Sequence, residues 1–252
     1  MKQFFFFITI LCSLQLLGQS NTALFNEANE LYNKGKYAEA IDKYRAILDH
    51  DVHSSELYFN LANANYKLNN IAPSIYYYEK ALQLDPNDED IKNNLAFAQN
   101  MTIDAIDNIP EVGLNKFINN TVRLYHTDIW AYISVVGVIC FVMLFLMYHF
   151  SYETRKKRTA FVFSLVAISI AVLSLSSAFY RNALNKKDRP AIVFAKESKV
   201  KSEPNVRSEE SFRLHEGTKL QVIDTIGNWS EIKLADGKTG WISNQDIKML
   251  KP

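Results

Sequence analysis

Few side chains in this chain of 252 residues have the types and spacing that catalysis or metal binding requires. His50 and His53 could share a helix face and bind a metal. No third or fourth ligand lies nearby in the sequence, so we interpret the pair as part of a solvated turn. The chain contains no nucleotide-binding glycine loop, no G-x-S-x-G or H-E-x-x-H motif and no convincing pair of acids. We therefore expect a protein that is not an enzyme and that needs no cofactor and no metal.

Cysteine content and net charge argue against two further kinds of chemistry. The two cysteines are Cys12, near the N-terminus, and Cys140, inside a long apolar segment where we expect it to be buried. If the N-terminus is removed, no disulfide can form within the mature chain, and a redox role for the thiol is not expected. The net charge of +1 predicts no basic surface for nucleic acid, so we expect no nucleic-acid partner.

The first apolar segment has the layout of a secretory signal peptide. Residues 4–17 are apolar, Lys2 precedes them, and polar residues follow from Gly18. The apolar stretch is too short to span a membrane comfortably. We predict a signal peptide over residues 1–19. An uncleaved anchor is the alternative, because Leu16 and Leu17 are not the small residues that a cleavage site prefers.

Two longer apolar segments, residues 129–150 and 160–180, contain no Asp, Glu, Lys or Arg. Each has about 21 residues, and a helix of that length is roughly 30 Å long, which matches the hydrocarbon core of a bilayer. Trp130 and Tyr180 are among the aromatic residues near their ends. We predict two transmembrane helices. A pair of buried core helices is the alternative, but a small domain could hardly cover both on all sides.

The charges around these segments predict the topology. The connecting loop, residues 151–159, contains four consecutive basic residues from Arg155 to Arg158, which favours a cytoplasmic position. A cleaved signal peptide places the region before the first span outside, in agreement with this. Lys186, Lys187 and other basic residues after the second span argue for the opposite orientation, but both flanks of one short hairpin cannot be inside. We predict a multi-pass membrane protein with both soluble regions outside and the connecting loop inside.

An internal repeat occupies residues 20–100. Asn26, Tyr44 and Leu48 recur as Asn60, Tyr78 and Leu82, an offset of 34 residues. Small residues, Ala28 and Ala40 in the first copy, would let the two helices of a hairpin approach closely. The segment resembles a tetratricopeptide-repeat domain, which implies an all-α solenoid. A third unit that starts at Glu89 is expected to be a capping helix.

The resemblance implies that the first helices of the repeats line a groove that binds a peptide or a protein. Asparagine side chains offer both a donor and an acceptor and could hold an extended backbone, although the alternative is that they only solubilise or cap the helices. The residues expected to face the groove are Asn26, Asn29, Asn60, Asn63, Tyr66, Lys67, Asn94 and Phe97.

Residues 101–128 link the repeats to the first span. Leu114, Phe117, Ile118, Val122 and Tyr125 recur at helical spacing on one face, with mostly polar residues on the other. We interpret this pattern as an amphipathic helix at the membrane interface. Packing against the repeat domain is the alternative.

Residues 190–252 read as a small all-β domain. Short β-rich runs at 191–195, 219–226, 229–234 and 239–242 are separated by turn signals. The segments Asn205-Val206-Arg207-Ser208, His215-Glu216-Gly217-Thr218 and Asp236-Gly237-Lys238-Thr239-Gly240-Trp241 resemble a bacterial SH3-like (SH3b) barrel. Trp229 and Trp241 are either a platform for a peptide or cell-wall glycan, or core residues of the small barrel.

The order of modules, from signal peptide through tetratricopeptide repeats and two spans to an SH3-like barrel, resembles the BatE type of the bacterial aerotolerance (Bat) family. That resemblance implies a multi-pass protein of the bacterial inner membrane with both soluble regions in the periplasm. It also implies work in stress tolerance with other Bat proteins, some with von Willebrand factor A domains, and with a MoxR-type ATPase. Three hypotheses follow: a scaffold for an envelope complex, a sensor that binds peptidoglycan through the SH3-like domain, and an enzyme of unrecognised type.

Overall fold

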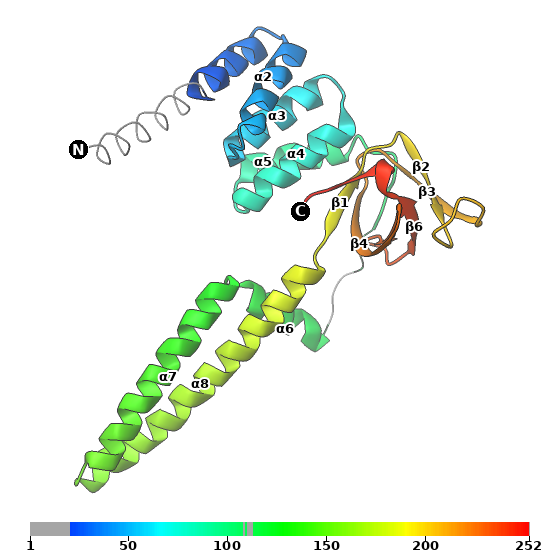
Figure 1. Cartoon of the computed structure of the whole chain (residues 1–252). Coiled ribbons are helices and arrows are strands. Elements are labelled where there is room, and N and C mark those ends of the chain that lie inside the picture. The colour runs from blue at the N-terminus through cyan, green and yellow to red at the C-terminus, as the bar shows by residue number, and fades with distance from the viewer. Residues whose placement is uncertain (1–20, 108, 110–112, 252) are drawn as a thin grey trace, which may run out of the picture. The chain divides into compact units, whose positions relative to one another are not determined.

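The computed structural model describes residues 21–107, 109 and 113–251 (Figure 1). The predicted signal peptide therefore lies outside the described residues. The chain folds into two compact units, of which one combines Met1–Asn108 with Arg189–Pro252 and the other is Ile109–Asp188. The first unit is thus discontinuous in sequence. Within it we call residues 21–107 the repeat module and residues 189–251 the β module.

The repeat module consists of helical hairpins at the predicted spacing. Gly35 and Asn69, which are equivalent in the two repeats, both have positive φ, at +77° and +59°. Each ends the first helix of its hairpin in the left-handed conformation that glycine and asparagine tolerate best. The helices cover residues 21–33, α2 (Tyr37–Asp49), α3 (Ser55–Lys67), α4 (Ile71–Leu84) and α5 (Glu89–Gln99).

Side chains fix where two of these helices, α3 and α5, begin. Ser54 and Asp88 are N-cap residues whose side chains accept hydrogen bonds from the backbone N–H groups of Leu57 and Ile91. Such caps satisfy donors that the helix cannot, and each contributes about 1 kcal/mol. The small residues expected to allow close helix contacts, Ala28, Ala62, Ala40 and Ser74, are all buried.

The β module is a single antiparallel sheet of seven strands with the order β3-β2-β6-β5-β4-β1-β7. The four predicted runs are confirmed as β1, β4, β5 and β6. The sequence analysis missed β2, β3 and β7. The strands are β1 (Pro190–Val193), β2 (Glu197–Lys201), β3 (Glu210–His215), β4 (Lys219–Ile226), β5 (Trp229–Lys233), β6 (Thr239–Ser243) and β7 (Ile247–Met249).

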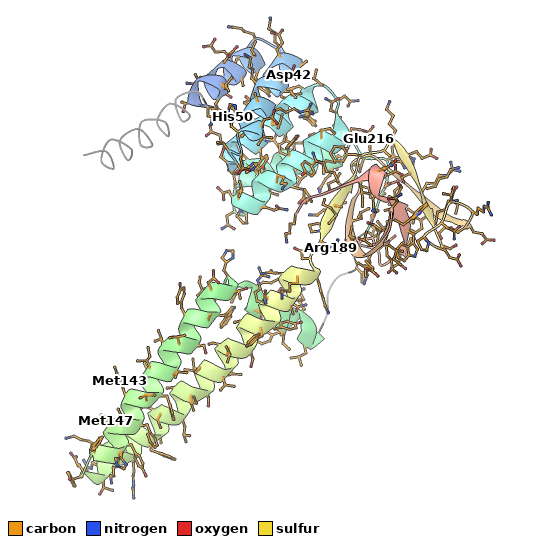
Figure 2. The ribbon with its side chains drawn as sticks, viewed as in Figure 1. Asp42, His50, Met143, Met147, Arg189 and Glu216 are labelled. Carbon is orange, nitrogen blue, oxygen red and sulfur yellow. The ribbon has the colours of Figure 1, made fainter. Side chains whose placement is uncertain are left out.

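The second unit is a helical hairpin, α7 (Thr127–Phe150) and α8 (Thr154–Lys187), preceded by α6 (Gly113–Arg123). By length and composition α7 and α8 could each cross a membrane, and only 11% and 22% of their most apolar stretches are buried. Core helices of a soluble domain would be mostly buried. The apolar side chains of Met143 and Met147 on α7, for example, are exposed (Figure 2).

Small residues let α7 and α8 pack closely. A Cβ atom on Gly137 would lie 3.0 Å from the Cβ atom of Ala171, and the Ser134 hydroxyl donates to the Ala171 carbonyl at 3.0 Å. Cys140 was expected to be buried in a membrane span, and on α7 its side chain lies at the surface of the helical hairpin.

Two boundaries differ from the prediction. Helix α8 begins at Thr154, so the basic residues Arg155–Arg158 lie on its first turns and the loop between the helices is shorter than the predicted 151–159. The linker predicted over 101–128 is divided, because its start belongs to the first unit whereas α6 lies in the second. Within that unit Val122 is buried, and Leu114 and Phe117 are 72% and 69% exposed.

Candidate protein-binding site

Asparagines of the predicted groove accept the same hydrogen bond from a tyrosine in both repeats. The Tyr44 hydroxyl donates to Asn29 Oδ1 at 2.6 Å, and the equivalent Tyr78 hydroxyl donates to Asn63 Oδ1 at 2.5 Å. Asn29 Oδ1 also accepts from Asn60 Nδ2 at 3.1 Å. These bonds tie the first helix of each hairpin to the second, so Asn29 and Asn63 have a structural role whatever they bind.

Burial keeps the two tyrosines in the donor form. Burial first, and then the nearby Tyr32 and Glu56, raise the pKa of Tyr44 to about 12. The pKa of Tyr78 is raised further, again mainly by burial. Both hydroxyls therefore stay protonated over the whole physiological pH range.

The remaining groove residues differ in how available they are to a partner. Asn94 donates its side-chain amide to the Asp90 carbonyl at 2.8 Å, and Tyr66 packs against the buried core of the repeat module. Asn26, Lys67 and Phe97 are exposed, Phe97 at 61%. These three are therefore the predicted groove residues best placed to contact a partner without disturbing the fold.

Trp229 and Trp241 lie on the outer face of the sheet, because the residues beside them in β5 and β6, including Ser230 and Ile242, point into the core. Both tryptophans are partly exposed. Glu231 and Lys201 lie opposite Trp241 on the two neighbouring strands, and Trp229 is its diagonal neighbour across the β5–β6 pair. The arrangement is two aromatic side chains flanked by charges of both signs.

The repeat module and the β module share an apolar core. Ile192 of β1 and Leu250 near the C-terminus are buried within the same cluster as the repeat helices. The ring of Phe194 lies 5.6 Å from that of Tyr76, whose hydroxyl donates to the Met249 carbonyl at 3.3 Å. We call this contact region the junction. Its apolar centre makes the two modules one folded unit.

A close backbone approach at Gly217 completes the apolar part of the junction. Gly217 has φ +89°, and a Cβ atom there would lie 2.9 Å from side-chain atoms of Ile71, Ile75 and Thr102. Only glycine combines that backbone conformation with the lack of space. The sequence analysis expected a tight turn at this glycine, and the structure adds that its neighbours belong to the repeat module.

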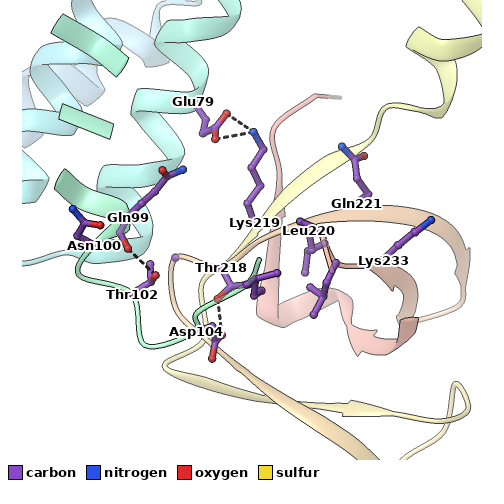
Figure 3. Close-up of a pocket in the computed structure, with 14 residues that line it drawn as sticks. Glu79, Gln99, Asn100, Thr102, Asp104, Thr218, Lys219, Leu220, Gln221 and Lys233 are labelled. Carbon is purple, nitrogen blue, oxygen red and sulfur yellow. Dashed lines mark hydrogen bonds and ion pairs between the residues drawn. The ribbon is translucent and has the colours of Figure 1, made fainter. Parts of the chain in front are cut away.

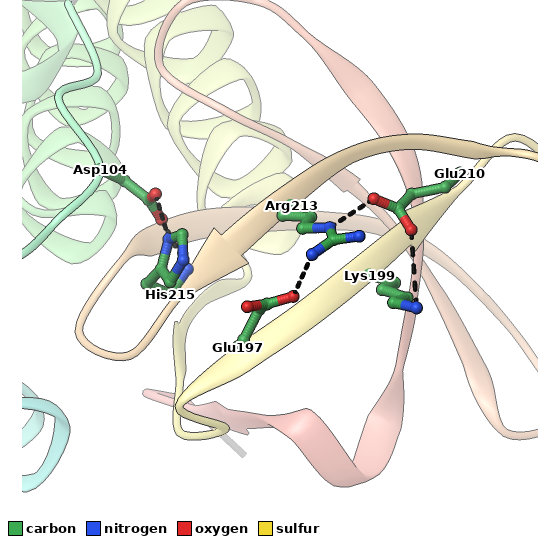
Figure 4. A network of polar contacts seen from close by, with 6 residues as sticks. All are labelled: Asp104, Glu197, Lys199, Glu210, Arg213 and His215. Atoms are coloured by element: carbon green, nitrogen blue, oxygen red, sulfur yellow. Dashed lines mark hydrogen bonds and ion pairs between the residues drawn. The ribbon is translucent and has the colours of Figure 1, made fainter.

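Two polar contacts flank the apolar centre. Lys219 Nζ donates to both carboxylate oxygens of Glu79 at 2.7 Å (Figure 3). Asp104 accepts hydrogen bonds from the Thr218 hydroxyl at 2.6 Å and from the His215 backbone N–H at 2.7 Å. The His215 ring also contacts Asp104, with an Nδ1–Oδ1 distance of 2.7 Å (Figure 4).

These hydrogen bonds determine the ionisation of Asp104. Burial by itself raises the pKa of its carboxyl group, but the bonds from Thr218 and from the side chain and backbone of His215 outweigh it, and the pKa is lowered. Asp104 is therefore a carboxylate at neutral pH and holds the segment after α5 against β3 and β4.

A cavity of about 720 Å³ opens beside these contacts. Figure 3 shows its lining, to which the repeat module contributes Gln99, Asn100 and Thr102, and the β module contributes Gln221 and Lys233. The lining is mixed, because apolar residues such as Ile106, Leu220 and Leu234 lie among these polar groups, and it belongs to both modules.

The outer side of β2 and β3 has a further polar network. Arg213 donates to Glu197 at 2.7 Å and to Glu210 at 2.5 Å, and Lys199 lies 3.8 Å from Glu210 (Figure 4). Lys199, Arg213 and Glu197 are about half exposed and Glu210 is 29% exposed, so these ion pairs contribute little to stability. They keep the β2–β3 hairpin charged and soluble at its edge.

Two family models match parts of the chain. Residues 25–89 match the tetratricopeptide repeat. Residues 197–248 match the bacterial SH3 domain. The repeat module is thus a tetratricopeptide domain, and the β module is built on a bacterial SH3 domain to which β1 adds a strand outside the matched range. Among curated proteins, none matches the chain.

The junction between the tetratricopeptide and SH3 domains was not found from the sequence. Glu79 and Lys219 are 140 residues apart, and no local pattern connects them. One signal was present, since Tyr76 occupies the position that Asp42 holds in the first repeat. An aromatic residue on what should be a solvated helix face indicates that something covers it.

Proposed function

We propose that this chain is a membrane-anchored scaffold of a bacterial envelope complex of the Bat (aerotolerance) type, which binds partner proteins through the tetratricopeptide groove. The observation that carries the proposal is the division of the repeat module into two sides. The SH3 domain packs against α4, a second helix, while Asn26, Lys67 and Phe97 on the first helices stay exposed. The described part of the chain therefore leaves the groove open for a partner.

The junction also supports the proposed topology. The two modules share a core, so they fold on the same side of any membrane, and the chain between them must cross an even number of times. Two apolar helices, α7 and α8, meet that requirement. An extracytoplasmic position for both modules in the inner membrane follows if the N-terminal segment acts as a signal peptide.

The partners proposed for the scaffold are Bat-type membrane proteins with von Willebrand factor A domains, together with a MoxR-type ATPase. Recognition of the Bat-type membrane proteins would use the exposed groove residues, since the asparagines that bond to Tyr44 and Tyr78 are already engaged. An exposed aromatic such as Phe97, next to polar neighbours, is a typical anchor in such interfaces.

Crosslinking in intact membranes followed by mass spectrometry tests this proposal. The variant Lys67→Ala/Phe97→Ala removes groove side chains that are exposed and lie outside the buried core. The control Lys36→Ala/Leu84→Ala removes an exposed lysine and an exposed apolar side chain elsewhere on the module. We expect the groove variant alone to lose at least half of the crosslinks to its main partner. Unchanged crosslinks in a folded groove variant would exclude the groove from partner binding.

The outward tryptophan pair favours a second candidate function, binding to cell-wall peptide or glycan through the SH3 domain. Aromatic faces flanked by Glu231 and Lys201 suit a ligand with both polar and apolar surfaces. Sedimentation of the detergent-solubilised full chain with isolated peptidoglycan tests it. Trp241→Ala should reduce the bound fraction severalfold, whereas Ile223→Ala, an exposed apolar residue on β4, should not.

A further inference from the structure

Three basic side chains from both modules gather beside the junction. They are Arg45 on α2, Lys80 on α4 and Lys248 on β7, and we call them the basic cluster. Lys248 Nζ lies 4.5 Å from the centre of the Tyr76 ring, and Lys80 Nζ lies 5.9 Å from the same centre. The cluster exists only because the β module packs on α4 and brings β7 to the repeat helices.

The basic cluster lacks the acidic partners that neighbouring cations have. Lys43 pairs with Glu27 at 2.8 Å, and Lys219 pairs with Glu79 at 2.7 Å. Within the part of the chain that the structure describes, no carboxylate lies within ion-pair distance of Arg45, Lys80 or Lys248. The fold thus holds three positive charges together without neutralising them.

This arrangement has an electrostatic cost that the protein offsets only in part. Burial first, and then the positive charges of Arg45 and Lys80, lower the pKa of Lys248, and burial also lowers the pKa of Lys80. The rings of Tyr76, Phe194 and Tyr77 lie 4.5 to 6.0 Å from the Lys248 ammonium and stabilise it through cation–π attraction. An anion placed among the three charges would remove the remaining repulsion.

We propose that the basic cluster binds an acidic segment of a partner protein, one that presents several Asp or Glu carboxylates. Neither Arg45 nor Lys80 lies near the N-terminus of its helix, so the backbone N–H groups that phosphate sites use are not part of the cluster. Separate ammonium and guanidinium groups on three elements match separate carboxylates along a peptide. The surface lies on the second helices and is distinct from the groove of the proposed function, so either site could be wrong without the other.

A binding titration with a defined probe tests the proposal. The full chain is held in nanodiscs of zwitterionic lipid, and a fluorescein-labelled hexaglutamate peptide is titrated by fluorescence anisotropy at low salt. The cluster variant is Arg45→Gln/Lys80→Gln/Lys248→Gln. The matched control, Lys34→Gln/Lys36→Gln/Lys92→Gln, loses the same charge from exposed lysines that pair with glutamates.

We expect the cluster variant to bind the peptide with a dissociation constant at least about tenfold higher than that of the wild type. The control should change the dissociation constant less than about twofold. Equal weakening in both variants, or no binding by the wild type, would overturn the proposal. Because Lys248 also touches the junction, Arg45→Gln alone provides a variant outside it, for which we expect about a threefold loss with an unchanged unfolding midpoint.

Two competitors separate the other possible occupants. If inorganic pyrophosphate displaces the peptide at lower concentration than unlabelled hexaglutamate does, the cluster is a small-anion site and the proposal is wrong. If nanodiscs that contain anionic lipid prevent peptide binding by occupying the cluster, it is a lipid site and the proposal is equally wrong. Displacement by hexaglutamate alone at matched charge would support a protein partner.

Discussion

The two tetratricopeptide repeats are equivalent in their interior and different on their outer faces. In both, a buried tyrosine of the second helix donates to an asparagine of the first, Tyr44 to Asn29 and Tyr78 to Asn63. On the outer face, Asp42 of the first repeat is exposed (Figure 2), whereas its equivalent Tyr76 is 6% exposed beneath the SH3 domain.

A second pair of outer positions shows the same difference. Arg45 is exposed, and its equivalent Glu79 is 8% exposed and paired with Lys219. The residues that recur in both repeats therefore specify the helical hairpin. The residues that differ between the repeats specify what packs against it. In this molecule the second repeat has become an internal docking site, while the first has kept a solvated outer face.

The largest expected effect on stability comes from replacing Tyr76 by alanine, compared with the same replacement of its equivalent Asp42 in the first repeat. Tyr76→Ala leaves a cavity beside Phe194 and removes the hydroxyl bond to Met249, so we expect it to lower the free energy of unfolding by about 4 kcal/mol. Asp42→Ala should change it by less than about 0.5 kcal/mol. Urea unfolding of the full chain in mild detergent, followed by circular dichroism, measures both. Similar small losses in the two variants would mean that Tyr76 is not at a packed contact.

The next largest effect compares two glycines: one where a side chain would only strain the backbone, and one where it would also collide with neighbouring side chains. Gly35 and Gly217 both have positive φ, but a Cβ atom at Gly35 meets nothing within 4 Å, whereas one at Gly217 meets three side chains of the repeat module. We expect Gly35→Ala to cost about 1 kcal/mol and Gly217→Ala about 3 kcal/mol. The same urea titration tests this. Equal costs would show that the neighbours of Gly217 can move aside freely.

A smaller effect follows from the charge of Asp104, which lies after α5 and bonds to His215 and Thr218 of the β module. Its pKa is lower in the folded chain, so the carboxylate contributes stability above its unfolded pKa of about 4, and that stability is lost as the pH falls through the folded pKa. Asp104→Asn should lower the free energy of unfolding by about 2 kcal/mol at pH 7.

The pH dependence provides the control for that prediction. Below about pH 4 the difference in stability between wild type and Asp104→Asn should shrink, because the unfolded wild-type chain takes up the proton first, and it should vanish below the lower pKa of the folded chain. Unfolding curves at pH 7, 5 and 3 measure the convergence. A difference that stays constant across this range would show that the lost bonds, and not the charge, account for the effect.

The sequence predicted what local periodicity encodes and missed what depends on distant partners. The 34-residue offset located the repeat helices, and β-rich runs between turn signals located β1 and β4 to β6. Strand β2 was missed because Glu197, Lys199 and Lys201 fill its outward positions and leave few apolar residues to count. The junction was missed because its contacts join residues such as Glu79 and Lys219, whose pairing no spacing rule can show.

The candidate site was predicted in the same uneven way. The resemblance to tetratricopeptide repeats placed Lys67 and Phe97 on the first helices, and both side chains are exposed. It did not reveal that Asn29 and Asn63 already accept bonds from tyrosines, because a hydrogen bond between two helices depends on their packing. For Trp229 and Trp241 the sequence left two alternatives, and the alternating burial of β5 and β6 assigns both to the outer face.

The smallest expected effect tests what the two repeats share. Tyr44→Phe and Tyr78→Phe each remove one hydroxyl that donates to a groove asparagine, and each should lower the free energy of unfolding by about 1 kcal/mol. Equal losses would show that the repeats are alike inside despite their different outer faces. A much larger loss for Tyr78→Phe would indicate that packing of the SH3 domain on the second repeat strengthens the hydrogen bond between Tyr78 and Asn63. The internal docking site and the groove would then be energetically coupled.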